Sequence, residues 1–334
     1  MDNIVIINSL NHEGAGVGRL KNGMVVFVPG ALPGERVSVE LVNIKKNYAV
    51  ARLLRIEEAS PERVLPPCPE ANSCGGCQRQ HLNYHSQLYW KRQFVVDALQ
   101  RLGGIAVNVR PVLGMQNPWG YRNKVRLHCD KGRLGFYRPG SHELTPLGRC
   151  PLLPPAMLDL ARMIERLLPT VAPGLKHLTL RQGWATGELL VVLETAAGWR
   201  SGKALAQQLA DYFPDIVSIV HKPEKRKEIV LYGRDYLEER LGTLRFHISS
   251  NTFFQVNSVQ AELLYEQTAA CAGLRGEEEV LDAYCGSGAI ALWLSRQAGQ
   301  VCGVEVMPQA IKDAWRNAAL NKITNANFLA GDAA

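Results

Sequence analysis

The feature that most restricts the fold is the alternation of short apolar runs and helix-like segments in residues 277–334. The chain there reads as strand, helix, strand, helix and strand. This order is typical of the first half of a doubly wound α/β sheet, with parallel strands and helices on the faces. We therefore predict a Rossmann-like α/β domain over residues 251–334. The pattern stops after its third strand, so we expect this domain to be incomplete.

A glycine-rich turn, LDAYCGSGAIAL, joins the first strand and helix of this pattern. Gly286 and Gly288 allow the backbone to approach a ligand at the start of the helix. Together with Ala291 they satisfy G-x-G-x-x-[GA], the dinucleotide pattern. On this basis NAD and S-adenosylmethionine are both open, and a structural turn without a ligand is a third interpretation.

Three features favour S-adenosylmethionine over NAD. Asp282, inside the first strand, suits a cationic ligand better than a pyrophosphate, and the loop has no Lys or Arg to meet a phosphate. Glu305 ends the second strand, where a carboxylate can accept hydrogen bonds from ribose hydroxyls, but this suits either ligand and does not distinguish them. Asp332 follows the third strand and can accept a hydrogen bond from the adenine amino group.

The first 60 residues have the pattern of a small β-barrel. MVVFVPG (residues 24–30) is a short apolar strand, and residues 35–57 alternate with period two, with a break at Lys45-Lys46-Asn47. Several short strands with Gly-rich turns predict an OB-like barrel over residues 1–58. Gly14, Gly16 and Gly18 resemble a phosphate loop, but no helix follows, and we interpret them as turn residues.

Residues 59–250 are predicted to form an α+β middle domain. A Pro-rich linker covers residues 60–70, and an amphipathic helix runs to Leu102, where Gly103-Gly104 ends it. Further helices are predicted over PAMLDLARMIERLL and around residues 201–212, and GELLVVLET is predicted to be a buried strand.

Charge is unevenly distributed along the chain. The net charge is +7; residues 1–60 carry seven basic and six acidic side chains, residues 61–150 thirteen and five, and residues 151–334 eighteen and twenty. A basic segment favours contact with a nucleic-acid backbone. There is no long apolar run and no signal peptide, so we expect a cytoplasmic protein with no membrane segment.

Three cysteines, Cys68, Cys74 and Cys77, lie within ten residues as C-x5-C-x2-C. A closed four-thiolate site needs one more ligand, and Cys150, followed by Pro151, is the best candidate. Spacing alone leaves zinc and iron–sulfur open. A redox pair of Cys74 and Cys77 and a set of inert buried thiols are the alternatives.

The chain resembles the RNA 5-methyluridine (uracil-C5) methyltransferases. EGAGVGRLKNGMVVFVPGALPGERV is similar to that family's RNA-binding TRAM domain, CGGCQRQHLNYHSQLYWKRQFV to its cysteine segment, and NTFFQVNSVQAELLY to its Phe-x-Gln-x-Asn signature. The resemblance implies a [4Fe–4S] cluster on Cys68, Cys74, Cys77 and Cys150. It also implies an S-adenosylmethionine site. The implied donor-site residues are Gln255, Tyr284, Gly286, Gly288, Glu305 and Asp332.

In this family a cysteine thiolate adds to C6 of uracil, C5 then attacks the donor methyl group, and a base removes the C5 proton. The target base must leave its stack, and Arg122, Lys124 and Phe254 are candidates to hold RNA or that base. No residue of the chain matches the nucleophile or the base. We therefore assign no catalytic residue, and expect a C-terminally truncated chain that is inactive alone.

The cluster implies the branch of the family that acts on 23S ribosomal RNA rather than transfer RNA. We expect a monomer. The alternatives are a non-catalytic RNA-binding iron–sulfur protein with a vestigial methyltransferase fold and an NAD-dependent oxidoreductase.

Overall fold

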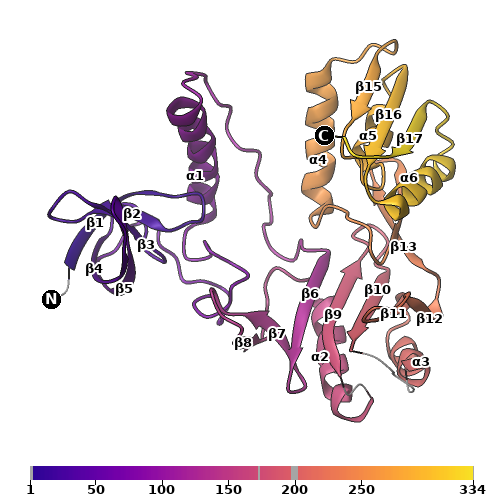
Figure 1. The fold of residues 1–334 in the computed structure, drawn as a ribbon, viewed down its shortest axis with the longest axis horizontal. Coiled ribbons are helices and arrows are strands. Elements are labelled where there is room, and N and C mark those ends of the chain that lie inside the picture. The colour runs from indigo at the N-terminus through magenta and orange to yellow at the C-terminus, as the bar shows by residue number, and fades with distance from the viewer. Residues whose placement is uncertain (1–2, 172–173, 197–201, 334) are drawn as a thin grey trace. The chain divides into compact units, whose positions relative to one another are not determined.

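The computed structural model describes residues 3–171, 174–196 and 202–333. The chain forms two compact units, Met1–Pro118 with Tyr137–Arg149, and Trp119–Phe136 with Cys150–Ala334. The elements of each are labelled in Figure 1. The domain boundaries predicted after residues 58 and 250 fall inside these units and stay predictions. In the described part of the chain no helix is long and apolar enough to cross a membrane.

The first unit contains a closed five-stranded barrel, which confirms the predicted OB-like fold. Its strands are β1 (Asn3–Leu10), β2 (Gly16–Arg19), β3 (Val25–Val28), β4 (Arg36–Ile44) and β5 (Tyr48–Glu58), in the order β1-β2-β3-β5-β4. The predicted break at Lys45-Lys46-Asn47 is the turn between β4 and β5. Alternate side chains fill the barrel, as period-two patterning requires. The buried set is Val5, Ile7, Val26, Val28, Ala31, Val37, Val39, Ala49 and Ala51.

Of the three early glycines, only Gly14 is a turn residue. Its φ is 90°, in the left-handed region that favours glycine. Gly16 and Gly18 lie in β2, so their interpretation as turn residues is wrong. A Cβ at Gly18 would lie 2.4 Å from Cγ1 of Val5, and one at Gly16 would lie 2.8 Å from the Ala31 carbonyl oxygen. These two glycines allow close packing inside the barrel.

The rest of the first unit holds the cysteine segment, a helix and the short strand β8 (Leu144–Pro146). The helix α1 (Tyr84–Asp97) continues as a π-helical turn, Ala98–Leu102, and ends at Gly103, as predicted. The Asn83 side chain begins α1 by accepting a hydrogen bond from the Ser86 N–H at 2.9 Å.

The second unit is built on a mixed sheet whose strands run in the order β12-β11-β10-β9-β6-β7. They are β6 (Lys124–Asp130), β7 (Arg133–Tyr137), β9 (Leu175–Gln182), β10 (Leu189–Thr195), β11 (Ile216–Pro223) and β12 (Ile229–Gly233). The predicted helices are α2 (Pro155–Val171), which packs on β9, and α3 (Gly202–Tyr212), which packs on β11 and β12. The predicted strand GELLVVLET is β10, and it is almost entirely buried.

The hairpin of β13 (Tyr236–Leu241) and β14 (Leu244–Ser249) leads to α4 (Ser258–Ala272) and then to a parallel sheet, β15-β16-β17. Its strands are β15 (Glu279–Asp282), β16 (Gln300–Glu305) and β17 (Ala326–Ala330). Helix α5 (Ala289–Leu294) connects the first two, and α6 (Pro308–Leu320) connects the last two. This arrangement confirms the predicted βαβαβ pattern (Figure 1). Helix α4 packs against α5 and β13 and was not predicted.

Candidate functional site

The glycine loop between β15 and α5 has the conformation that its sequence predicts. Gly286 and Gly288 both have positive φ, 54° and 80°. A Cβ at Gly286 would meet nothing within 4 Å, whereas one at Gly288 would lie 3.0 Å from the Phe328 ring. Gly286 therefore faces open space, where a ligand can approach the backbone, and Gly288 packs against the domain.

Glu305, at the end of β16, is oriented by the loop. Its Oε2 accepts a hydrogen bond from the Gly286 N–H at 3.2 Å, and its Oε1 accepts one from the Met307 N–H at 2.9 Å. The Gly331 N–H, just after β17, donates to the Glu305 carbonyl at 3.0 Å. The carboxyl ends of β15, β16 and β17 thus meet beside the loop, as in other doubly wound sheets.

Asp282 has one unsatisfied carboxylate oxygen at the same edge. Its Oδ2 is buried and has no hydrogen-bond partner among the described residues. Burial raises the pKa of Asp282, the backbone N–H groups of Tyr284 and Ala291 oppose this, and Glu305 raises it further. A carboxylate with one buried oxygen left without a partner, beside the second carboxylate of Glu305, fits a ligand with a cationic group and hydroxyls.

The remaining residues predicted for the donor lie at or near this edge. Tyr284 is 73% exposed on the loop, and Asp332 is exposed just after β17. The structure therefore brings together Tyr284, Gly286, Gly288, Glu305 and Asp332, whose contacts with a donor stay predictions.

Gln255 lies in the segment between β14 and α4, and neighbouring strands fix its backbone. The Asn123 side chain donates to the Gln255 carbonyl at 3.0 Å and to Ser258 Oγ at 2.9 Å. Arg181, fully buried on β9, donates to the Thr252 carbonyl at 3.0 Å. Burial lowers the pKa of Arg181 to about 10. The role of the Gln255 side chain at the donor stays a prediction.

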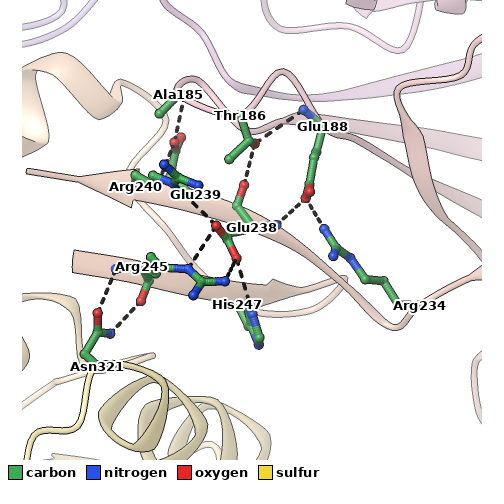
Figure 2. A network of polar contacts seen from close by, with 10 residues as sticks. All are labelled: Ala185, Thr186, Glu188, Arg234, Glu238, Glu239, Arg240, Arg245, His247 and Asn321. Carbon is green, nitrogen blue, oxygen red and sulfur yellow. Dashed lines mark hydrogen bonds and ion pairs between the residues drawn. The ribbon is translucent and has the colours of Figure 1, made fainter. Parts of the chain in front are cut away.

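Two adjacent acidic residues on β13, which the sequence analysis did not identify, connect this strand to Ala185 and to Arg245 of β14 (Figure 2). Glu239 is 1% exposed and accepts hydrogen bonds from the N–H groups of Trp184 and Ala185 at 2.8 and 3.0 Å. It also accepts one from Ser258 Oγ at 2.7 Å. The neighbouring Glu238 pairs with Arg245 at 2.6 Å, and chiefly this hydrogen bond lowers its pKa. These acids have a structural role, since each is satisfied by groups of the protein.

The structure corrects the prediction that Phe254 contacts RNA. Phe254 is 3% exposed and packs against Phe246 in the core, with ring centroids 5.6 Å apart. The next residue toward the N-terminus, Phe253, is 67% exposed. The aromatic residue available to a nucleic-acid base in this segment is therefore Phe253.

Arg122 and Lys124, the other predicted RNA contacts, lie at the start of β6. Arg122 donates from Nε to the Lys124 carbonyl at 3.1 Å. The pKa of Lys124 is lowered to about 8, first by burial and then by Arg181, Lys222 and Arg126, whereas Glu194 opposes the shift. Lys124 is thus part of a cluster of basic side chains on neighbouring strands.

Cys285 does not have the properties of a nucleophile. It is 7% exposed, and burial, Asp282 and Glu305 raise its pKa to about 12. Its position near the start of α5 suggests a lowered pKa, but burial and two carboxylates outweigh that effect. A Cβ at Gly303 of β16 would lie 2.8 Å from its Sγ, so the thiol packs against the sheet.

The cysteine segment is a compact turn, and its three thiols influence one another. The Gly76 N–H donates to the Cys74 Sγ at 3.4 Å. Burial raises the pKa of Cys74, and Cys77 and Cys68 raise it further. Cys150 belongs to the second unit. Among the described residues, no group of three or more His, Cys, Asp or Glu side chains is arranged to hold a metal ion, so the predicted cluster stays a prediction.

Comparison with protein families gives two matches. Residues 4–54 match the TRAM domain, and residues 84–332 match a family described as tRNA (uracil-5-)-methyltransferase. The second match covers most of the chain, including the loop, Glu305 and Asp332.

Individual proteins that are similar to this chain are also RNA methyltransferases by their descriptions. An RNA methyltransferase of Bacillus cereus, described as uncharacterized, is 40% identical over 98% of this chain and 77% of its own length. One from Clostridium tetani is 39% identical over 98% and 76%. The crystal structure of Pyrococcus abyssi tRNA (uracil-54, C5)-methyltransferase with S-adenosyl-L-homocysteine superposes with a TM-score of 0.77 and 28% identity, over 99% of this chain and 79% of that one.

Proposed function

The chain belongs to the tRNA (uracil-5-)-methyltransferase family and carries a TRAM domain, and we propose that it serves S-adenosylmethionine-dependent methylation of carbon 5 of uracil in RNA. The observation that carries this proposal is the edge of the β15-β16-β17 sheet. There the unpaired Oδ2 of Asp282 and the backbone-anchored Glu305 lie beside Gly286, which has no side chain to block a ligand. A non-catalytic RNA-binding protein would not need this arrangement.

We propose the following roles for residues at the donor. Glu305 accepts hydrogen bonds from the ribose hydroxyls, since its carboxylate is already oriented by two N–H groups. Asp282 faces the positive charge of the donor, and Asp332 accepts from the adenine amino group. Tyr284, Gly286, Gly288 and Gln255 line the same site. The donor supplies the methyl group.

In the proposed reaction a cysteine thiolate adds to C6 of uracil, so that C5 becomes nucleophilic and attacks the donor methyl group. A base then takes the C5 proton, and the thiolate leaves. None of residues 1–334 is assigned as the nucleophile or the base. Cys285 in particular is unsuited, because its thiol is buried and stays protonated at neutral pH.

Donor binding tests this proposal directly. S-adenosylhomocysteine, titrated calorimetrically into the protein, is expected to bind, and Glu305→Gln to weaken binding by about tenfold or more, the effect of losing a charge-assisted hydrogen bond. NADH is the control ligand. Binding of NADH in preference to S-adenosylhomocysteine would contradict the proposal.

We further propose a [4Fe–4S] cluster on Cys68, Cys74, Cys77 and Cys150. It is supported by the C-x5-C-x2-C spacing of the first three cysteines and by the Gly76 N–H that donates to the Cys74 Sγ. Anaerobically purified protein is then expected to contain about four iron and four sulfide per chain. Cys74→Ser should lose them, and Cys271→Ser, at an exposed cysteine, should not. Absence of iron from Cys271→Ser as well as from Cys74→Ser would contradict the cluster.

The cluster cysteines support 23S ribosomal RNA as the substrate, whereas the similar P. abyssi enzyme is named for tRNA uracil-54. Affinities for fragments of the two RNAs, measured at one fixed salt concentration, distinguish them. Tighter binding of the ribosomal fragment is expected, and tighter binding of transfer RNA would overturn this choice.

A further inference from the structure

One face of α6 carries three polar side chains at intervals of four residues: Asp313, Asn317 and Asn321. Such spacing on a helix usually indicates a face exposed to solvent. Here Asp313 and Asn317 are 1% and 0% exposed. Buried polar side chains need partners, and the partners of these residues lie in two segments distant in the sequence.

The first partner is β14. Asn321 accepts from the Arg245 N–H at 2.8 Å and donates to the Arg245 carbonyl at 2.7 Å. Figure 2 shows this pair of contacts. One turn earlier on the helix, Asn317 Oδ1 accepts from the His247 N–H at 2.7 Å. One turn earlier again, Asp313 Oδ2 accepts from Ser249 Oγ at 2.7 Å.

The two periods match. Four residues of an α-helix advance about 6 Å, and two residues of a strand advance about 6.6 Å. Positions 321, 317 and 313 of α6 therefore meet positions 245, 247 and 249 of β14 in order. Asp313 also accepts a hydrogen bond from Thr252 Oγ1, in the segment that leads to Gln255.

The second partner is the glycine loop. Asn317 Nδ2 donates to the Ser287 carbonyl at 3.1 Å. Ser287 lies between Gly286, whose N–H binds Glu305, and Gly288, which begins α5. The single amide of Asn317 thus holds β14 with its oxygen and the loop with its nitrogen.

We propose that Asn317 is a positioning residue for the methyl donor: by holding the Ser287 carbonyl it fixes the glycine loop, and the N–H of Gly286 with it, in the conformation that receives the ligand. This inference rests on the proposed function. An amide suits this role because its oxygen can accept from one main-chain group while its NH2 donates to another.

The test uses Asn317→Asp, which retains the acceptor for His247 but replaces the donor toward Ser287 with an oxygen. The matched control is Asn325→Asp. Asn325 Nδ2 also donates to main-chain carbonyls, those of Ser295, Ala298 and Gly299, but does not contact the glycine loop. Affinity for S-adenosylhomocysteine and melting temperature are measured for both variants and the wild type.

Asn317→Asp is expected to lower the affinity for S-adenosylhomocysteine by about tenfold. The affinity of Asn325→Asp should stay within about twofold of the wild-type value, even if its melting temperature falls. RNA affinity should be unchanged in both. A folded Asn317→Asp with wild-type donor affinity overturns the inference, and so does an equal loss of affinity in the two variants.

Hydrogen exchange keeps the inference testable if Asn317→Asp does not fold or the wild type binds no donor. In Asn317→Ala without ligand, the amides of residues 284–288 should exchange at least about tenfold faster than in Asn325→Ala, because the loop has lost its anchor. Equal rates overturn the inference. Absence of S-adenosylhomocysteine binding by the wild type, with faster exchange in Asn317→Ala, contradicts the proposed function alone.

Discussion

The charge of Asp282 is unfavourable for folding, and in the proposed function it favours binding of the donor. Its Oδ2 has no partner among the described residues, and burial raises its pKa. The folded protein therefore holds the proton more tightly than the unfolded chain does. Stability without ligand should decrease as the pH rises from the ordinary value of 3.8 through the raised value.

We predict that Asp282→Asn separates the two effects. The amide can still accept from the N–H groups of Tyr284 and Ala291, so the melting temperature without ligand should stay equal or rise, and its decrease with pH in the acidic range should disappear. Donor affinity should fall by about tenfold or more, because the carboxylate that faces the cation is gone. Thermal melts from pH 4 to 7 and calorimetry check both, and an unchanged donor affinity would refute the assigned role.

Phe253 and Phe254 provide a matched pair of substitutions. Phe254→Ala should reduce the free energy of unfolding by about 3–5 kcal/mol, since it empties a core position. Phe253→Ala should change stability by no more than about 0.5 kcal/mol but weaken RNA binding by about tenfold, in the range for loss of one stacked base. Denaturant unfolding and fluorescence anisotropy with RNA measure the two effects. Loss of RNA affinity only in Phe254→Ala would reverse the assignment.

At the residue scale the sequence predicted the positive-φ glycines of the loop between β15 and α5, but not which of two adjacent phenylalanines is buried. Adjacent phenylalanines are equivalent in a sequence pattern, and only the path of the backbone after β14 decides between them. The position of Cys285 near a helix start would by itself lower the pKa of its thiol, but burial beside Asp282 and Glu305 raises it. Such effects depend on distances between segments that the sequence does not specify.

At the scale of elements, the periodicity of apolar residues was sufficient to predict a strand or helix where one face of that element is buried. Strands β4, β5 and β10 and helices α2 and α3 lie where alternation or helical spacing predicted them. Helix α4 was missed, because its apolar residues are not confined to one stripe. Val259 and Leu264 are exposed, while Tyr265 and Ala269 are buried. The row of polar residues Asp313, Asn317 and Asn321, here called the polar ladder, was missed for the opposite reason. In the sequence, polar residues at helical spacing look like a solvent-exposed face even when they are buried.

Glu35, just before β4, links the barrel to the segment that follows it. It is fully buried, accepts from the Leu32 N–H at 2.8 Å and pairs with Arg63 at 2.5 Å. Burial raises its pKa, but Arg63 and the backbone donors outweigh burial and lower it overall. The resulting stabilisation is present above about pH 4.5 and is lost as the pH falls through the lowered value.

We predict that Glu35→Gln destabilises the barrel by about 2–4 kcal/mol, because Arg63 loses its buried partner. The control is Glu58→Gln, which breaks the exposed pair with Arg36 and should cost no more than about 1 kcal/mol. Denaturant unfolding at pH 7 and pH 4 measures both, and the difference between Glu35→Gln and the wild type should shrink at pH 4. Equal decreases in the free energy of unfolding of the two variants would show that the buried pair stabilises the protein no more than the exposed pair does.

For the molecule as a whole, the charge count along the sequence located only some of the basic side chains that gather around Lys124. The excess was found in residues 61–150, but the groups that lower the pKa of Lys124 include Arg181 and Lys222 from later strands. Strand pairing in the second unit places them together, since Lys124 of β6 lies opposite Arg181 of β9. A count by sequence segment cannot detect such a cluster.

Lys124 should therefore make RNA binding depend on pH. Its pKa of about 8 means that it loses its charge between pH 7 and 9, and affinity for a polyanion should fall over that range. Lys124→Arg should bind with much less dependence on pH, because arginine stays charged. Fluorescence anisotropy with one RNA at constant ionic strength measures the ratio of affinities at the two pH values. The same ratio in the variant and the wild type would exclude Lys124 as its source.

The contacts between the polar ladder and β14 also determine which sequence changes β14 can tolerate. Asn321 and Asn317 bind main-chain groups of residues 245 and 247, which every amino acid except proline provides. The contacts with α6 therefore do not depend on which side chains stand at these two positions, but they do depend on the number of residues between them. One inserted residue in β14 would shift the later contacts out of phase with the helix and leave buried amides unpaired. Among related proteins, insertions and deletions should therefore be absent from this strand.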